Sequence, residues 1–70
     1  MNPRRSNVKI DTFRFWWNVT WFDTEMLKQH GRGEMALLFK KRQRAEEFAR
    51  SLQEGASEEV LDLLREARLT

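Results

Sequence analysis

One aromatic segment, from Thr12 to Phe22, limits what this chain can fold into more than any other part of it. The segment contains all three tryptophans of the 70-residue chain. Its aromatic and β-branched residues alternate with other residue types, which is typical of a β-strand with one buried face. This alternation predicts a buried face composed of Phe13, Phe15, Trp17, Val19 and Trp21.

The opposite face of this predicted strand is mixed, because Arg14, Trp16 and Phe22 share it with small polar residues. Tryptophan and arginine are enriched among the residues that dominate binding interfaces. The mixed face is therefore a candidate binding surface. The alternative is a second small core, in which Val8, Ile10 or the connecting segment folds over Trp16 and Phe22.

The start of the strand is ambiguous. In an uninterrupted strand, Val8 and Ile10 would lie on the same face as Trp16 and on the opposite face from Phe13. Either the strand begins near Thr12, or a bulge between Ile10 and Phe13 resets its faces. If Val8 and Ile10 do pair, they extend the sheet on its mixed side.

Residues 23–40 are expected to return the chain to a second strand. Residues 23–33 fit either a short helix, capped by Asp23 or Thr24 and ended by Gly31, or a long hairpin loop. Residues 34–40 form a short segment whose middle, Met35 to Phe39, is apolar. This predicts a strand paired with the first one as a hairpin. A sheet of two strands has two open edges, and such an edge can accept a strand from a partner.

The last thirty residues predict two helices. Apolar residues at positions i, i+3, i+4 and i+7 indicate an amphipathic helix over residues 41–54, which Gly55 ends. These residues are Ala45, Phe48, Ala49 and Leu52. Ser57 is a suitable N-cap for a last helix. Its predicted apolar stripe is Val60, Leu61, Leu63, Leu64 and Ala67.

These elements together predict a small α+β domain. An antiparallel β-hairpin packs on two C-terminal helices, with or without a short helix between the strands. The domain spans residues 8–70, and residues 1–7 form a flexible basic arm. Two adjacent arginines in that arm, Arg4 and Arg5, could reach a phosphate or a carboxylate.

Several function classes are disfavoured by composition. The chain has no cysteine and one histidine, His30, so it lacks a zinc-ligand set, which needs about four ligands. We expect no cofactor and no enzymatic activity. The longest apolar run, Met35 to Phe39, is far shorter than a membrane span, and absent cysteines suit a reducing compartment. We therefore expect a cytoplasmic monomer without membrane contact.

The charge distribution indicates a second candidate surface. Residues 1–44 carry ten Lys/Arg and four Asp/Glu, whereas residues 45–70 carry three and seven. Such asymmetry signals either a partner such as nucleic acid or an acidic protein, or attraction between the two halves. Basic residues cluster at the start of the first long helix, where they oppose its dipole. This cluster is Lys40, Lys41, Arg42 and Arg44, and Arg4, Arg5, Lys9 and Arg32 are candidates to join it.

Two kinds of function fit these surfaces. The first is a protein-binding regulator that captures a partner by strand addition or through its Trp/Arg face. The second is a nucleic-acid-binding protein that combines basic residues with aromatic stacking. The candidate partner-binding residues for both are Arg4, Arg5, Lys9, Arg14, Trp16, Phe22, Lys40, Lys41, Arg42 and Arg44.

The length, the basic start over residues 1–9, the aromatic segment and residues 39–52 resemble a small bacteriophage transcription regulator that binds host RNA polymerase. The resemblance implies binding to the β′ subunit near its amino terminus and to the β flap, at the RNA exit channel. It further implies inhibition of initiation through σ-factor displacement, suppression of termination, and action in the host cytoplasm. Residues 39–52 are also similar to a strand-to-helix segment that recurs in small prokaryotic and phage proteins.

Overall fold

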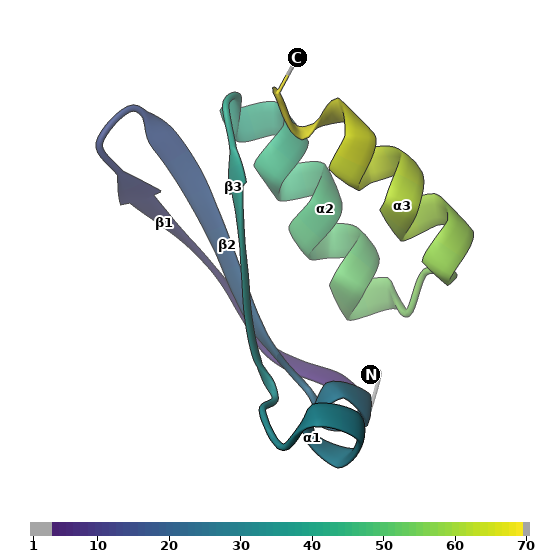
Figure 1. The fold of residues 1–70 in the computed structure, drawn as a ribbon. Helices are drawn as coiled ribbons and strands as arrows, with labels where there is room; N and C mark the ends of the chain where they lie inside the picture. The colour runs from purple at the N-terminus through teal and green to yellow at the C-terminus, as the bar shows by residue number, and fades with distance from the viewer. Residues whose placement is uncertain (1–3, 70) are drawn as a thin grey trace.

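The structure, a computed structural model that describes residues 4–69, has three strands and three helices, followed by a 3₁₀ turn (Figure 1). The strands are β1 (Arg5–Phe13), β2 (Trp16–Asp23) and β3 (Glu34–Phe39). The helices are α1 (Thr24–His30), α2 (Arg42–Glu54) and α3 (Glu58–Glu66), and the 3₁₀ turn is Ala67–Leu69. The predicted α+β class and its two C-terminal helices are confirmed, but the sheet has one strand more than the sequence predicts.

The aromatic segment does not form a single strand, because the chain reverses direction at Arg14 and Phe15. Phe13 of β1 pairs directly with Trp16 of β2 in an antiparallel hairpin. Arg14, the first of the two loop residues, has a positive φ of 58°, as in a type II′ turn, whose twist suits a hairpin. A positive φ favours glycine, so an arginine there carries backbone strain.

The reversal removes two phenylalanines from the predicted buried face. Phe13 is 55% exposed and Phe15 is 92% exposed, so their placement in the core is wrong. The prediction holds for the residues after the turn, because Val19 and Trp21 are buried and Trp17 packs against the core. The three strands lie in the order β1-β2-β3, and every neighbouring pair is antiparallel.

A bulge in β1 accounts for Val8 and Ile10. The pairing register shifts between Ser6 and Lys9, and Asn7 has a positive φ of 54°, which asparagine adopts more readily than most residues. Ile10 then lies opposite Val19, on the face toward α2. The bulge predicted between Ile10 and Phe13 is wrong, as is a strand start near Thr12.

β1 begins at Arg5, which also changes the predicted basic arm. Residues 5–7 belong to the strand, and residues 1–3 lie outside the described part of the chain. Arg5 is 6% exposed, so it is a buried residue of the domain and not part of a flexible arm.

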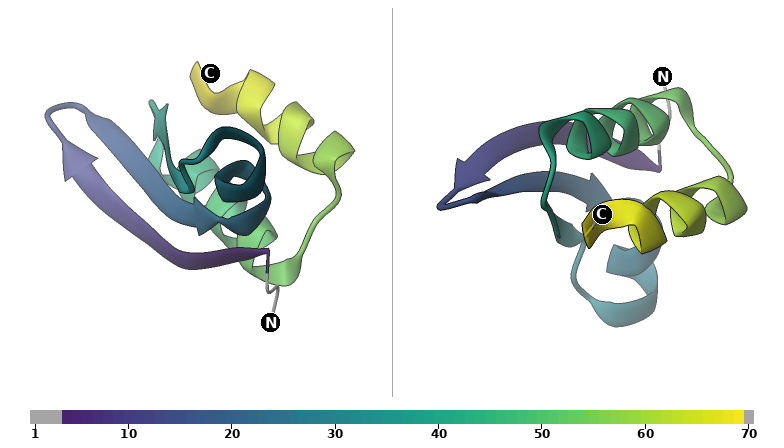
Figure 2. Two further views of the ribbon diagram at one scale, coloured as in Figure 1. Left: turned by 60° about the horizontal axis from the view of Figure 1, so that its bottom comes forward. Right: turned by 90° about the horizontal axis from the view of Figure 1, so that it is seen from above.

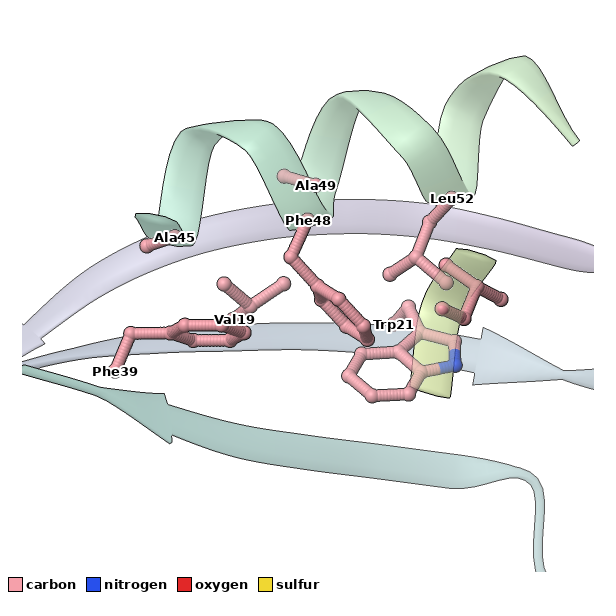
Figure 3. Packing of buried hydrophobic residues seen from close by; sticks show 8 residues of the cluster. Val19, Trp21, Phe39, Ala45, Phe48, Ala49 and Leu52 are labelled. Atoms are coloured by element: carbon pink, nitrogen blue, oxygen red, sulfur yellow. The ribbon is translucent and has the colours of Figure 1, made fainter. Parts of the chain in front are cut away.

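Helices α2 and α3 lie on the same side of the sheet (Figure 2). We call this side the covered face; its central residues are Ile10, Val19, Trp21, Leu37 and Phe39. The Phe48 ring of α2 packs between two of these residues, with centroids 5.4 Å from Trp21 and 5.2 Å from Phe39 (Figure 3). All four residues predicted on the buried face of α2 are buried.

The contribution of α3 is smaller than its apolar stripe predicts. Leu61 is fully buried and Leu64 packs against the core. Val60 and Leu63 are 43% and 66% exposed, because a helix at the margin of the core buries only a narrow stripe. Within residues 4–69, no helix has the length and apolar character needed to cross a membrane.

The segment between β2 and β3 forms the predicted short helix and not the alternative long loop. The Asp23 side chain caps α1 by accepting hydrogen bonds from the backbone N–H groups of Glu25 and Met26, and Gly31 ends the helix with a φ of 73°. Gly33 then follows in close contact with Phe22. A Cβ atom at position 33 would lie 2.7 Å from the Phe22 ring, so the chain re-enters the sheet beneath that ring.

Candidate functional site

The side of the sheet opposite α2 and α3 is the candidate surface predicted from the mixed face, and we call it the open face. Successive residues of a strand point to opposite sides of the sheet, so residues of the open face alternate with residues of the covered face. None of the large residues there is fully buried, and Leu38 is 37% exposed. The open face consists of Lys9, Asp11, Phe13, Trp16, Asn18, Thr20, Phe22, Glu34, Ala36 and Leu38.

Aromatic and basic residues gather where the β1–β2 hairpin turns. Trp17 pairs with Phe39, the last residue of β3, so the segment between β3 and α2 begins beside the aromatic end of β2. The chain thereby brings two stretches about 25 residues apart in sequence to one end of the sheet. We call this region the tip surface; it comprises Phe13, Arg14, Phe15, Trp16, Lys40, Lys41 and Arg42.

Two of the four cations of the tip surface, Arg14 and Arg42, lie against aromatic rings, and both side chains are exposed. The Arg14 guanidinium carbon is 5.9 Å from the centroid of Phe13, and that of Arg42 is 5.7 Å from the centroid of Trp17. Both distances fit cation–π attraction, which is worth about 0.5–1 kcal/mol at exposed sites. Arg42 also forms an ion pair with Glu46 at 3.2 Å, yet its side chain stays 70% exposed.

The two arginines predicted in the arm lie at the other end of the sheet and already have acidic partners. Arg4 Nε is 3.3 Å from Asp23 Oδ1, and its Nη1 is 3.2 Å from Glu58 Oε1. Arg5 Nη2 donates to the same Glu58 oxygen, and Arg5 Nε is 3.8 Å from Asp23 Oδ2. Arg4 and Arg5 thus join the start of β1 to the start of α3, which is an attraction between the basic and acidic halves.

Asp23 is the centre of this charged cluster, and its replacement tests the structural role of the two arginines. Asp23→Ala is expected to lower the free energy of unfolding by about 2 kcal/mol, because it removes a helix cap and a carboxylate beside buried Arg5. Asp23→Asn keeps an oxygen for the cap and should lose less. Urea unfolding followed by circular dichroism measures both. An Asp23→Ala protein of undiminished stability would contradict this role.

The other predicted residues lie apart from the tip surface. Lys9 is opposite Thr20 in the middle of the open face. Phe22 is near the far end of β2 from the tip, half-buried over Gly33, and it lines a hollow of about 270 Å³ with Leu27 of α1. Arg44 forms an ion pair with Glu47 of the same helix at 3.5 Å. The structure therefore groups half of the ten predicted residues at the tip surface: Arg14, Trp16, Lys40, Lys41 and Arg42.

The exposure of Phe13 and Phe15 was not predicted from the sequence. The alternation continues through the turn without a glycine, asparagine or proline to mark it, so it places both residues in the core. Ile10 and Val19 share the covered face, yet one has an even and the other an odd residue number. Only this difference in alternation signals a reversal of the chain between them. The tip surface therefore contains two exposed phenylalanine rings, Phe13 and Phe15, in addition to the predicted Arg14 and Trp16.

The remaining titratable side chains of residues 4–69 form no further group that could hold a metal ion. His30 is the exposed last residue of α1. Within the described residues, no group of three His, Cys, Asp or Glu side chains is arranged to hold a metal ion. Comparison of the chain with protein-family models, curated proteins and solved structures finds no significant match.

Proposed function

We propose that this protein is a non-enzymatic regulator that acts by binding a macromolecule through the tip surface. The observation that carries the proposal is the placement of exposed Phe13 and Phe15 beside Arg14 and half-buried Trp16. A solvated ring gains free energy when a partner covers it, about 25 cal/mol for each Å² of apolar surface removed from water. Phe15, at 92% exposure, has no evident role in the core.

The partner that we propose is bacterial RNA polymerase, contacted at the β′ amino-terminal region and the β flap. The support for this partner is the resemblance of the chain to a phage transcription regulator. The composition of the tip surface suits a protein interface, because aromatic residues and arginine carry most of the binding energy in such interfaces. Binding at that position would displace the σ factor, inhibit initiation and suppress termination.

A single-stranded nucleic acid is the second candidate partner, and a specific observation favours it. Phe13 and Phe15 are exposed, the Arg14 guanidinium lies against Phe13, and the basic segment of Lys40, Lys41 and Arg42 follows β3 at the same end of the sheet. Proteins that stack bases beside a basic groove combine the same residue types. Stacking of one base on an aromatic ring contributes about 1–3 kcal/mol. Arg4 and Arg5, at the other end of the sheet, are already paired with carboxylates, so they are less available to a phosphate.

A salt titration separates the two partners. Purified core polymerase and a labelled single-stranded RNA are each titrated with the protein at increasing salt concentration. Binding to RNA would weaken linearly with log salt, with a slope of about −0.7 for each phosphate contacted. Binding to polymerase through an aromatic surface is expected to depend less on salt, because burial of apolar area is not screened.

The result of the titration can support either candidate or rule out both. Tight binding to polymerase with a shallow salt slope supports the proposed regulator. Binding to RNA alone, with a slope of several units, replaces it with the nucleic-acid candidate. If the protein binds neither polymerase nor RNA at concentrations at which other regulators saturate polymerase, the proposed function is wrong. The Glu59→Lys variant, which changes charge on α3 away from the tip surface, is the control.

A further inference from the structure

Most cations of the tip surface have no acidic partner within the protein. Arg14, Lys40 and Lys41 are exposed, and no ion pair between residues 4–69 includes any of them. The fourth cation, Arg42, pairs with Glu46 of the same helix. The first turn of α2 contains no acidic residue. The positive charge of this region is therefore left for a partner.

The arginines at the other end of the sheet are in the opposite situation. Arg4 and Arg5 share the carboxylates of Asp23 and Glu58. Attraction between the basic and acidic halves of the chain therefore accounts for these two arginines. It does not account for the cations of the tip surface, which fit the other meaning of such a charge asymmetry, a negatively charged partner.

The cations and the exposed rings are close enough for one short segment to reach both. Lys40 follows Phe39, which pairs with Trp17 in β2. The preceding residue of β2, Trp16, pairs with Phe13 in β1. Neighbouring strands lie about 4.8 Å apart, so the distance across the sheet from β3 to β1 is about 10 Å. An extended segment of about three residues covers that length.

We propose that the tip surface binds a short acidic segment of its protein partner, which also carries an apolar side chain. The carboxylates of this segment pair with Arg14 and with the basic residues 40–42. Its apolar side chain packs on the rings of Phe13 and Phe15. Charge complementarity identifies this occupant, because four cations beside exposed rings match a segment that is both acidic and apolar. The proposal rests on the proposed function and adds the chemistry of the segment that polymerase presents.

The basic segment is partly fixed before a partner arrives. The Lys40 N–H donates to the Arg68 carbonyl at 2.9 Å, which anchors the start of the segment. The Arg42 guanidinium lies against Trp17 and pairs with Glu46. A guanidinium has five N–H donors, so one ion pair leaves donors for a second carboxylate. Because these groups are already oriented, less conformational entropy is lost on binding.

The extent of the positive region favours a short acidic segment over a strand of nucleic acid. Acidic residues follow the cations on the elements that lead away from the tip surface, with Asp11 on the open face of β1 and Glu46 and Glu47 in α2. Proteins that bind single strands have a positively charged groove that follows the phosphate backbone. Four cations bounded by carboxylates form no such groove, whereas they match a few carboxylates of a protein segment.

Pairing with carboxylates also agrees with a shallow dependence on salt. Nucleic acid carries condensed counterions, and their release on binding produces a steep dependence on salt concentration. A short acidic segment has a lower charge density and releases fewer ions. The salt slope expected for polymerase therefore stays below the slope expected for RNA.

Zero-length cross-linking of the full chain to purified core polymerase tests the proposal. A carbodiimide joins an amine to a carboxylate only where the two are in contact. The chain has four lysines, Lys9, Lys28, Lys40 and Lys41, and only the last two belong to the tip surface. We expect mass spectrometry to find links from Lys40 or Lys41 to Asp or Glu residues of polymerase, and none from Lys9 or Lys28.

Charge removal gives an independent measure. Lys40→Gln combined with Lys41→Gln is expected to weaken the affinity for core polymerase about tenfold, because two exposed ion pairs are lost. Lys28→Gln combined with Arg50→Gln removes the same charge from exposed positions outside the tip surface, and the affinity should be unchanged. All four side chains are exposed, so both double variants should keep the circular dichroism spectrum of the original protein.

The results separate the proposal from the function on which it rests. If no complex with polymerase forms, the proposed function is wrong, and the acidic segment with it. If a complex forms without links from Lys40 or Lys41, or with equal affinity for the tip double variant, the acidic segment is wrong and the proposed function stands. A tip double variant that loses affinity for single-stranded RNA and not for polymerase assigns these cations to phosphates and also overturns the proposal.

Discussion

Replacing Phe48 by alanine is expected to leave the domain largely unfolded at room temperature. Phe48 is fully buried, and its ring packs against Trp21, Phe39 and the guanidinium of Arg65. Removal of a buried phenylalanine ring lowers the free energy of unfolding by about 3–5 kcal/mol. A core in a chain this small supplies about 3–5 kcal/mol in total, so the loss equals the whole stability of the domain.

The matched control is the same substitution at a position where the ring is solvated. Phe15→Ala removes an equal number of atoms from a side chain that is 92% exposed, and the change in stability should stay within about 0.5 kcal/mol. Thermal unfolding followed by circular dichroism measures both variants, with the near-ultraviolet tryptophan signal as a readout of packing. A folded Phe48→Ala protein with a native near-ultraviolet spectrum would contradict the proposed centre of the core.

The contrast between these two phenylalanines also shows what could be predicted from the sequence. The burial of Phe48 follows from a helical period that depends only on residues within two turns of it. The exposure of Phe15 depends on a turn whose residues carry no turn signal, so alternation alone places it inside. The parity of Ile10 against Val19 contains the missing information, because a two-residue loop exchanges the parity of the two strands.

The candidate surface also contains residues that could be predicted from the sequence and contacts that could not. Residue type identified Arg14 and the basic segment after β3 as candidates, and strand parity identified Trp16. Arg14 lies in the hairpin turn and not on the strand face predicted for it. The pairing of Arg5 with Glu58 could not be predicted, because these residues are 53 positions apart and meet only once α3 has packed. Long-range contacts decide which of several similar basic residues are left for a partner, and local patterns do not encode that choice.

Arg14 provides the sharpest test of the tip surface, because its backbone and its side chain should act in opposite directions. Its φ of 58° is strained for an arginine and unstrained for glycine. Arg14→Gly is therefore expected to raise the free energy of unfolding by up to about 1 kcal/mol. The same change removes a cation from the centre of the tip surface, where loss of an anchor residue weakens binding by about 2 kcal/mol, or about 30-fold.

If Arg14→Gly makes the protein more stable and weakens its binding, Arg14 contributes to binding and not to stability. Arg14→Lys is the matched variant: it keeps the charge and the strained turn but lacks the planar guanidinium, so its stability should be unchanged and its affinity intermediate. Affinity for core polymerase and for single-stranded RNA is measured by biolayer interferometry, and stability by urea unfolding. If Arg14→Gly binds both ligands as tightly as the original protein, the tip surface is not the binding surface. If it instead loses stability, the strain at the hairpin turn is not what the φ value implies, and the hairpin depends on contacts of the arginine side chain with Phe13.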